Sequence, residues 1–278
     1  MDDAGHVAGL VRAADPDRYL STLYAPEDKR RSLFALYGFN AEIASVRDRI
    51  REPMAGEIRL QWWRDAIAAP AGEQTGNPVA DELRIAVAGH ELPWKAFDDM
   101  LSARVFDLYD DPMPDRTTLE GYCGETASAL IQLASLVLDP AAARRHADLA
   151  GHAGCAQAIT GLLRLLPIHR SRGQCYLPRD LLSAAGLTPE EFVSDEPGPK
   201  HRHAVSAAAA LASEHLDAFR SGAAGLPQSL RPAYLPLAPV RRYLDKIARR
   251  ADPFAEIADI PAVTRHAVTL RRAIRGWA

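Results

Sequence analysis

Residues 158–178 read AITGLLRLLPIHRSRGQCYLP, and this stretch decides how the chain is interpreted. Leu165 and His169 stand four residues apart, close to one helical turn, so on a continuous helix they would share one face. Pro167 lies between them and would disturb that helix, because proline removes a backbone donor and clashes with the preceding turn. The stretch therefore predicts a helix that is interrupted where two facing side chains would otherwise project together.

Helical patterns separated by proline and glycine fill the rest of the sequence. Apolar residues recur at i, i+4, i+7 and i+11 from Phe39 to Ile50, which predicts one helix from about residue 26 to residue 50. Gly154 is expected to weaken the helix that is predicted between residues 140 and 166. Strict alternation of polar and apolar residues, which would indicate strands, is nearly absent. We predict an all-α fold, with residues 1–278 forming a single helical domain around a common core.

Composition and charge exclude several classes of protein. The formal net charge is −3, so the sequence lacks the basic signature of a nucleic-acid-binding protein. The three cysteines form no CxxC pair and no zinc pattern, and their odd number argues against a disulfide framework. The first residues lack a basic region followed by an apolar core, and no apolar run approaches the roughly 20 residues that span a bilayer. We therefore expect a cytoplasmic protein in a reducing compartment.

Several segments, taken in order, resemble the squalene/phytoene synthase family over most of the chain. The segments are DRYLSTLYAPEDKRRSLFALYGF (17–39), LQWWRD (60–65), GYCGETAS (121–128), QAITGLLR (157–164), RGQCYLP (172–178) and YLPLAPVRRYL (234–244). None is decisive alone, but their order and spacing are specific. The resemblance implies the isoprenoid-synthase (terpenoid synthase) helical bundle with a central cavity.

The resemblance also implies a chemistry that the residues can be tested against. Family members join two allylic prenyl diphosphates head to head, and two aspartate-rich motifs on facing helices hold Mg²⁺. Departure of diphosphate concentrates negative charge, which hard divalent cations with oxygen ligands stabilise. Carboxylates at i and i+4 lie on one helix face and can share such an ion.

Most of these carboxylates are missing here. Aligned on ALYGF (35–39), the first motif's aspartates fall on Ala44, Ser45 and Asp48, so only the last keeps its acid. Aligned on Gln157 and Arg164, the two aspartates of the second motif fall on Leu165 and His169. The asparagine that usually precedes that motif is Gly161. We therefore expect no metal and no other cofactor.

Other acids could in principle replace the missing ligands. Glu42 and Asp48 are six residues apart, about 120° from a common helix face. Asp65 lies on a neighbouring predicted helix and could turn inward. If the protein is active, Asp48 and Asp65 would be its catalytic residues, with Asp48 as a ligand of Mg²⁺.

Basic residues gather where the motifs have lost their acids, among them Arg47, Arg164, Arg170 and Arg172. Arginine can bind phosphate bidentately without a metal, so a pocket that retains an anionic or prenyl-like ligand is one interpretation. The other interpretation, which we favour, is that these arginines pair with Glu42, Asp48 and Asp65 and so close the bundle. The residues expected to bind a ligand are Tyr37, Arg47, Gln157, Arg164, Arg172 and Tyr176.

These residues lead to two competing hypotheses about function. FNAEI (39–43), LQWWRD and PVRRYL (239–244) resemble a catalytically eroded branch of the family that includes a mitochondrial assembly factor for respiratory complex I. The first hypothesis is therefore a non-catalytic scaffold or ligand-sensing protein whose partners are subunits or assembly proteins of a membrane complex. The second is an active head-to-head prenyltransferase of isoprenoid biosynthesis with displaced metal ligands.

The C-terminal part is rich in arginine, which suggests one more contact. Arginines recur from Arg241 to Arg275, and this pattern is either a solvated helix face or a surface for anionic lipid. Peripheral attachment to the inner membrane is therefore an alternative to a purely cytoplasmic location, with Trp277 as an interfacial anchor.

Overall fold

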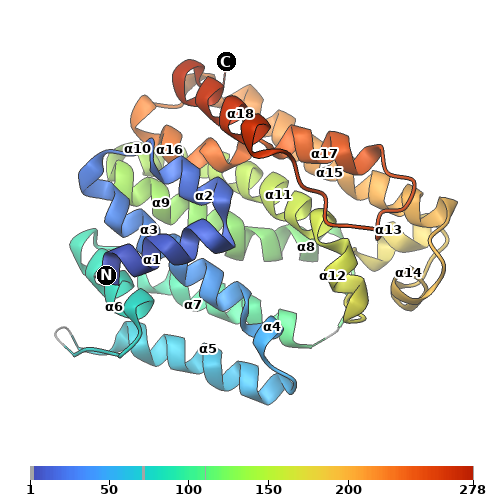
Figure 1. The fold of residues 1–278 in the computed structure, drawn as a ribbon, viewed down its shortest axis with the longest axis horizontal. Helices are drawn as coiled ribbons and strands as arrows, with labels where there is room; N and C mark the ends of the chain where they lie inside the picture. The colour runs from blue at the N-terminus through green and yellow to red at the C-terminus, as the bar shows by residue number, and fades with distance from the viewer. Residues whose placement is uncertain (1–2, 71–72, 110, 278) are drawn as a thin grey trace.

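A computed structural model describes residues 3–70, 73–109 and 111–277, and within these ranges the chain is helical and contains no strand. The all-α prediction is confirmed. In Figure 1, α11 runs alongside α15, while α3 packs against α1, α6 and α9. The N-terminal half comprises α1 (Asp3–Ala14), α2 (Pro16–Thr22), α3 (Glu27–Ala44), α4 (Val46–Arg49), α5 (Pro53–Ala68), α6 (Pro78–Gly89), α7 (Trp94–Val105), the short helix η1 (Phe106–Leu108) and α8 (Arg116–Cys123).

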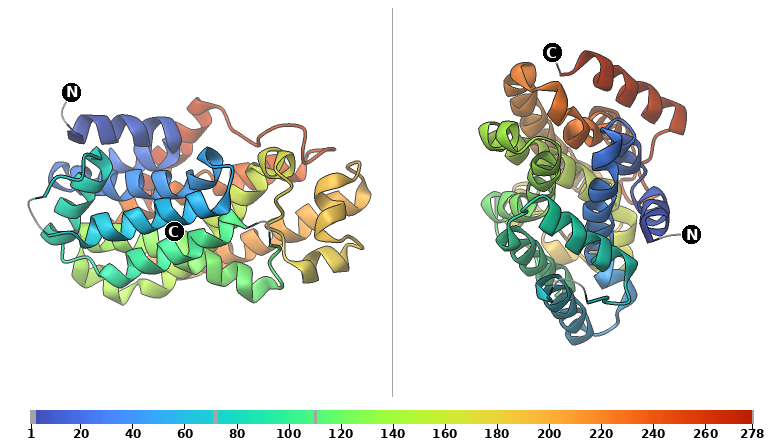
Figure 2. Two further views of the ribbon diagram at one scale, coloured as in Figure 1. Left: turned by 90° about the horizontal axis from the view of Figure 1, so that it is seen from below. Right: turned by 90° about the vertical axis from the view of Figure 1, so that its left-hand side faces the viewer.

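The C-terminal half continues the bundle and returns to α2. It comprises the π-helical turn η2 (Gly124–Ser128), α9 (Ala129–Leu138), α10 (Pro140–Arg145), α11 (Ala147–Arg164), α12 (Leu166–Ser171), α13 (Arg179–Ala184), α14 (Pro189–Ser194), α15 (Pro199–Gly222), η3 (Ala223–Gly225), η4 (Gln228–Leu230), α16 (Arg231–Tyr234), η5 (Leu235–Leu237), α17 (Val240–Ala248) and α18 (Ala262–Arg275). Helix α5 lies at one margin of the bundle and α18 at the opposite margin (Figures 1 and 2).

Local sequence explains where several helices begin. The Asp15 carboxylate accepts from the backbone N–H of Arg18 at the start of α2, and Asn77 caps α6 by accepting from Val79 and Ala80. Both caps are followed by proline at the first helical position, where its missing N–H costs nothing. These caps satisfy backbone donors that a helix start leaves without partners.

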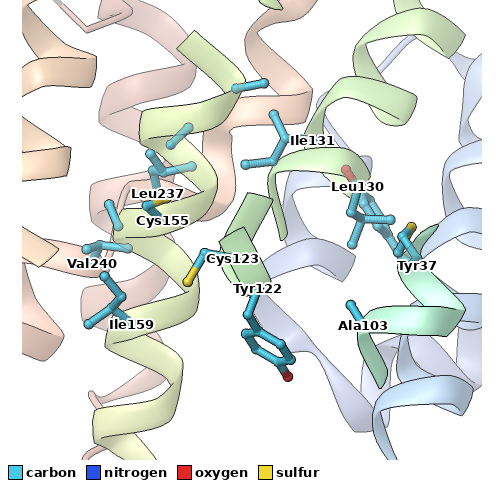
Figure 3. Packing of buried hydrophobic residues seen from close by; sticks show 14 of the residues in the cluster. Tyr37, Ala103, Tyr122, Cys123, Leu130, Ile131, Cys155, Ile159, Leu237 and Val240 are labelled. Carbon is cyan, nitrogen blue, oxygen red and sulfur yellow. The ribbon is translucent and has the colours of Figure 1, made fainter. Parts of the chain in front are cut away.

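The expectation that Gly154 weakens its helix is wrong. Helix α11 is continuous from Ala147 to Arg164, and Gly154 lies where it meets η2. A Cβ on Gly154 would come within 2.3 Å of the backbone nitrogen of Ser128, so the glycine permits a close approach between two segments. Figure 3 shows Cys155 and Ile159 of α11 lying across from Cys123 and Tyr122 in the core that this approach creates.

The predicted helix over residues 26–50 is broken in two. Helix α3 ends at Ala44 and α4 starts at Val46, with Ser45 between them at φ −89° and ψ 1°. The Ser45 hydroxyl donates to the carbonyl of Glu42 (2.9 Å), which offers that carbonyl an alternative to continuing the helix. The apolar spacing continues through Val46 and gives no sign of a one-residue break.

Candidate functional site

A cavity of about 590 Å³ opens between α2, α3, α11 and η5. Its wall combines small and apolar side chains, such as Ala44 and Val240, with many charged ones. Among the described residues, six arginines and four aspartates line it, and it contains no lysine or glutamate. The charged residues in the wall are Asp15, Asp17, Arg18, Arg47, Asp48, Arg104, Asp107, Arg164, Arg172 and Arg265. A central cavity is therefore present, and its wall is more polar than that of a purely apolar tunnel.

Both degenerate motifs lie in this wall, and each lies at a helix break. Leu165 joins α11 to α12 at φ −94° and ψ 11°, nearly the same conformation as Ser45. Pro167 explains the second break, because proline fits the first turn of a new helix and not the middle of an old one. Ala44, Ser45, Leu165 and His169 all border the cavity, so the alignment places the missing acids where the family would need them.

Every aspartate in the wall is engaged by an arginine. Asp48 accepts from Arg172 (2.5 Å), which links the end of the first motif to the segment after the second. Three further ion pairs complete the set: Asp15–Arg18, Asp17–Arg265 (N···O 2.8 Å) and Asp107–Arg104 (N···O 3.0 Å). Asp15, Asp48 and Asp107 accept hydrogen bonds from their arginines, while Asp17 faces Arg265 as an ion pair and accepts from the Tyr243 hydroxyl (2.9 Å). A carboxylate engaged in this way has less charge and fewer lone pairs to offer a cation.

Asp107 is the centre of a buried network. It is 5% exposed, and the hydroxyls of Tyr122 and Tyr176 donate to it at 2.9 and 3.0 Å. The Gln174 side chain donates to its backbone carbonyl at 2.9 Å. Burial, together with the negative charge of Asp107, raises the pKa of Tyr176 well above its ordinary value, so the phenol stays a donor. This network fixes the wall below the second motif.

His169 occupies the position of an acid but carries no charge at neutral pH. Its side chain is buried, and its ring lies 4.7 Å from the ring of Tyr176. Burial lowers the pKa of His169 to about 4, and the positive charge of Arg172 adds to the effect. The substitution of a neutral imidazole for an aspartate therefore removes a negative charge from the cavity without adding a positive one.

The structure brings together most of the residues predicted to bind a ligand. Arg47, Gln157, Arg164, Arg172 and Tyr176 border the cavity. Gln157 accepts from Arg18 at 3.0 Å, so its amide positions that arginine.

Tyr37 does not line the cavity. It is buried in the core on α3, and the Arg18 guanidinium lies 5.8 Å from the centre of its ring. Burial raises the pKa of Tyr37 to about 12. In the structure, its ring packs beside the guanidinium of Arg18.

Arg172 pairs with one of the expected acids, whereas Arg164 and Arg170 bind other groups. Arg172 binds Asp48 as predicted, but Arg164 donates to the carbonyl of Ala258 (2.9 Å) and reaches Asp259 (3.3 Å). Its guanidinium also stacks on Tyr243 at 3.8 Å, so Arg164 fastens the segment after α17 to α11. Arg170 turns away from the cavity and donates to the carbonyl of Asp195 (2.8 Å).

Two acids that were weighed as replacement ligands do not serve the cavity. Asp65 is exposed on α5, where it accepts from Gln61 at 2.8 Å, so the expectation that it could turn inward is not met. Glu42 is buried and pairs with Arg49 and Arg59 at 3.3 and 3.6 Å. Asp48 and Asp65 therefore form no common site.

Sequence reasoning missed part of the wall. Asp17 and Arg18 lie in the first segment that resembles the family but were not singled out, and Asp107 and Arg265 belong to no motif. Asp15 could have been found, because an acid before Pro16 is a helix-cap signal. Nothing local to Asp107 predicts that two tyrosines from distant segments converge on it.

An all-helical bundle with this cavity between facing helices is the terpenoid-synthase class of fold. Solved structures agree: the chain matches a dehydrosqualene synthase with a TM-score of 0.80, covering 97% of this chain and 94% of that one at 17% identity. It matches the squalene synthase of Alicyclobacillus acidocaldarius with a TM-score of 0.72, covering 89% and 93% at 20% identity. At these identities the likeness establishes the fold alone.

Sequence comparisons also identify the family of the chain. Residues 11–272 match the model of the squalene/phytoene synthase family, and the chain belongs to that family. Human NADH dehydrogenase (ubiquinone) complex I, assembly factor 6, is 33% identical over 86% of this chain and 72% of its own length. The presqualene diphosphate synthase of Zymomonas mobilis is 31% identical over 65% of this chain and 62% of its own length.

The residues of the cavity do not fit the Mg²⁺ clusters that the family implies. Alanine and leucine at the leading motif positions supply no oxygen, and Asp48, the last motif acid, is paired with Arg172. Among the described residues, no three His, Cys, Asp or Glu side chains converge in a way that could hold a metal ion. Where a magnesium site needs carboxylates, the second motif carries Leu165 and the neutral His169.

Proposed function

We propose that this protein is a non-catalytic member of its family that assists the assembly of respiratory complex I, and that its cavity holds an anionic or prenyl-like ligand without ionising it. One observation carries the proposal: each aspartate of the cavity wall is already paired with an arginine. Ionisation of an allylic diphosphate needs cations bridged by free carboxylates, and these carboxylates are committed to the protein's own cations.

The relatives support the assembly role. Complex I assembly factors from cow, rat, mouse and human are 33–35% identical over 86% of the chain. The presqualene diphosphate synthases are 28–31% identical over 61–71% of it. The greater similarity to the assembly factors extends over more of the sequence.

The cavity supports the ligand. Its volume of about 590 Å³ falls in the range of small-molecule sites. Six arginines against four aspartates leave the wall positive on balance, which favours an anion. Arginine forks can hold a phosphate with no metal present, and Arg172 borders the cavity at the position where the second motif ends.

Deletion of the gene from its own host tests the assembly role. We expect less assembled complex I on native gels, and full restoration by the wild-type gene. A gene with Asp48→Asn should restore assembly equally well, because Asp48 is not used for catalysis. Asp65→Asn, at an exposed site, is the matched control. Unchanged complex I after deletion would contradict the proposal.

Turnover assays test the absence of catalysis. Purified protein incubated with farnesyl or geranylgeranyl diphosphate and Mg²⁺ should yield no squalene, phytoene or presqualene diphosphate. The competing function, an active prenyltransferase, draws on the identity to presqualene diphosphate synthases and predicts a product that Asp48→Asn abolishes. Any such product from the wild-type protein would overturn the non-catalytic proposal.

Ligand retention has its own measurement. Farnesyl diphosphate added in the presence of EDTA should raise the Tm of the wild-type protein, and farnesol should raise it less. Arg172→Gln should lower the apparent affinity for farnesyl diphosphate, obtained from these Tm shifts, about tenfold or more. The reason is that the variant loses a charge-assisted hydrogen bond to phosphate. Arg170→Gln is the control, because Arg170 faces away from the cavity.

A further inference from the structure

Helix α18 (Ala262–Arg275) is attached to the bundle by its polar face. Arg265 pairs with Asp17 and Asp259 at 2.8 Å each, and Arg231 donates to the carbonyls of Ala273 and Ile274 at 3.2 Å. Thr269 is the buried residue of this helix. A surface helix usually turns its apolar stripe toward the core and its charges toward water, so α18 is oriented the other way round.

The apolar stripe of α18 points into solvent. Val263, Ala267, Leu270 and Ile274 follow the spacing i, i+4, i+7, i+11, which places them within a narrow sector of one helix face. Val263 is 81% exposed, Leu270 48% and Ile274 69%. The right-hand view of Figure 2 shows α18 at the outer margin of the bundle. This stripe is a contiguous apolar surface with nothing packed on it in the described chain.

Guanidinium groups border the stripe along one side. His266 lies on one side of it and Arg271 and Arg275 on the other, and α18 contains no acidic residue. Arg242 of α17 and Arg249, which directly follows α17, border a shallow hollow together with Thr264 of α18. Asp245 and Lys246 line the same hollow, so this surface gains two more guanidinium groups and one acid–lysine couple. Within the ranges that the structure describes, no ion pair engages the guanidinium of Arg242, Arg249, Arg271 or Arg275.

The charge is segregated to this end of the molecule. Residues 240–277 contain nine lysines and arginines and four acids, while the whole chain has a net charge of −3. An apolar stripe about 17 Å long with guanidinium groups along one edge matches a laterally extended anionic surface. In the described residues, no helix has the length and apolar character needed to cross a bilayer.

We propose that α18 is an interfacial helix that docks this protein on an anionic membrane surface. Val263, Leu270 and Ile274 enter the boundary between headgroups and acyl chains, and Arg271 and Arg275 contact lipid phosphates. Trp277 takes no part, which corrects the expectation that it is an interfacial anchor: it is buried against Phe219 with ring centroids 4.9 Å apart. The proposal goes beyond the function proposed above and does not depend on it.

Docking through α18 would also place the cavity near lipid. Arg265 projects from the inner face of α18 into the cavity wall, so the cavity and the apolar stripe are separated by about one helix diameter, roughly 10 Å.

Vesicle flotation with the full chain tests the proposal. We expect binding to vesicles of phosphatidylcholine mixed with phosphatidylglycerol, weaker binding to phosphatidylcholine alone, and a loss of binding as salt rises. The double variant Leu270→Ser, Ile274→Ser and the double variant Arg271→Gln, Arg275→Gln should each lose about tenfold or more in partition coefficient. Both changes are at exposed sites, so thermal unfolding should stay close to wild type.

Two control variants and one variant with increased binding complete the test. Ile58→Ser, at a similarly exposed isoleucine on α5, and Arg144→Gln, Arg145→Gln on α10 should leave vesicle binding unchanged. Val263→Trp should strengthen binding, a result that misfolding cannot imitate. Equal flotation with neutral and anionic vesicles would overturn the proposal. So would a dimer in light scattering that the Leu270→Ser, Ile274→Ser variant dissociates, because the stripe would then bind a second copy of the chain.

Discussion

Arg172 donates a hydrogen bond to Asp48 across 124 positions of sequence, and this contact joins the remnants of the two metal-binding motifs. In a metal-dependent family member, carboxylates of these two segments would bind Mg²⁺. Here the carboxylate of Asp48 is paired with the guanidinium of Arg172. Neither Ala44 nor Leu165 can supply a metal ligand, and Asp48 already has a cationic partner.

Asp48→Asn tests whether the Asp48–Arg172 pair has replaced a metal. Both side chains are partly exposed, so the pair stabilises the fold by no more than about 1 kcal/mol, and the variant should unfold in urea close to the wild type. Millimolar Mg²⁺ should leave both unfolding curves unchanged, as it should for Asp65→Asn. Stabilisation of the wild type by Mg²⁺ that disappears in Asp48→Asn would mean that Asp48 ligates a metal.

Asp107→Ala should be the most damaging substitution in the cavity wall. It leaves the buried guanidinium of Arg104 without its carboxylate and removes the acceptor for two tyrosine hydroxyls. Breaking a buried charge pair from one side costs about 3–5 kcal/mol in the free energy of unfolding. Tyr176→Phe removes a single hydrogen bond and should cost about 1 kcal/mol. Comparable urea midpoints for the two variants would show that the network does not stabilise the fold.

The fold and the positions of the missing acids could be predicted from sequence, because the resemblance to the family extends along most of the chain. Aligned on ALYGF and on residues 157–164, the resemblance implies motif positions at Ala44 and Leu165, and both residues border the cavity. The break at Ser45 could not be predicted in this way, because hydrophobic periodicity continues through a one-residue interruption.

The partners of charged side chains were harder to predict. Asp107 receives hydrogen bonds from Tyr122 and Tyr176, which lie far along the chain and have no spacing relationship to it. Trp277 was expected at a membrane surface because it is aromatic and follows a basic helix, yet it packs into the core. Sequence indicates that such groups need partners, and only tertiary structure selects which ones they take.

His169 should make the protein less stable in mild acid. Its pKa is lowered from the usual 6.5 to about 4 in the folded state, so between these values the unfolded chain binds more protons than the folded one. Stability is therefore fully present above pH 6.5 and is lost as the pH falls toward 4, by up to about 3 kcal/mol. The free energy of unfolding, measured with urea at several pH values in this range, should depend less steeply on pH for His169→Gln than for the wild type. His266→Gln, at an exposed histidine, should keep the pH dependence of the wild type. The same pH dependence in all three proteins would contradict the assignment to His169.

Two glycines of α11 should respond to alanine in opposite directions. At Gly154 the new methyl group would meet the backbone of Ser128 at 2.3 Å, a contact that side-chain motion cannot relieve, so α11 and η2 must move apart. We expect a cost of at least about 2 kcal/mol in the free energy of unfolding. At Gly161, which stands where the family usually has asparagine, a Cβ meets nothing within 4 Å. Gly161→Ala should therefore stabilise the helix by about 0.5–1 kcal/mol, because alanine loses less backbone entropy on folding. Since both sites are on one helix, helix propensity alone predicts the same gain at each, and equal stabilisation by the two substitutions would rule out the close approach at Gly154.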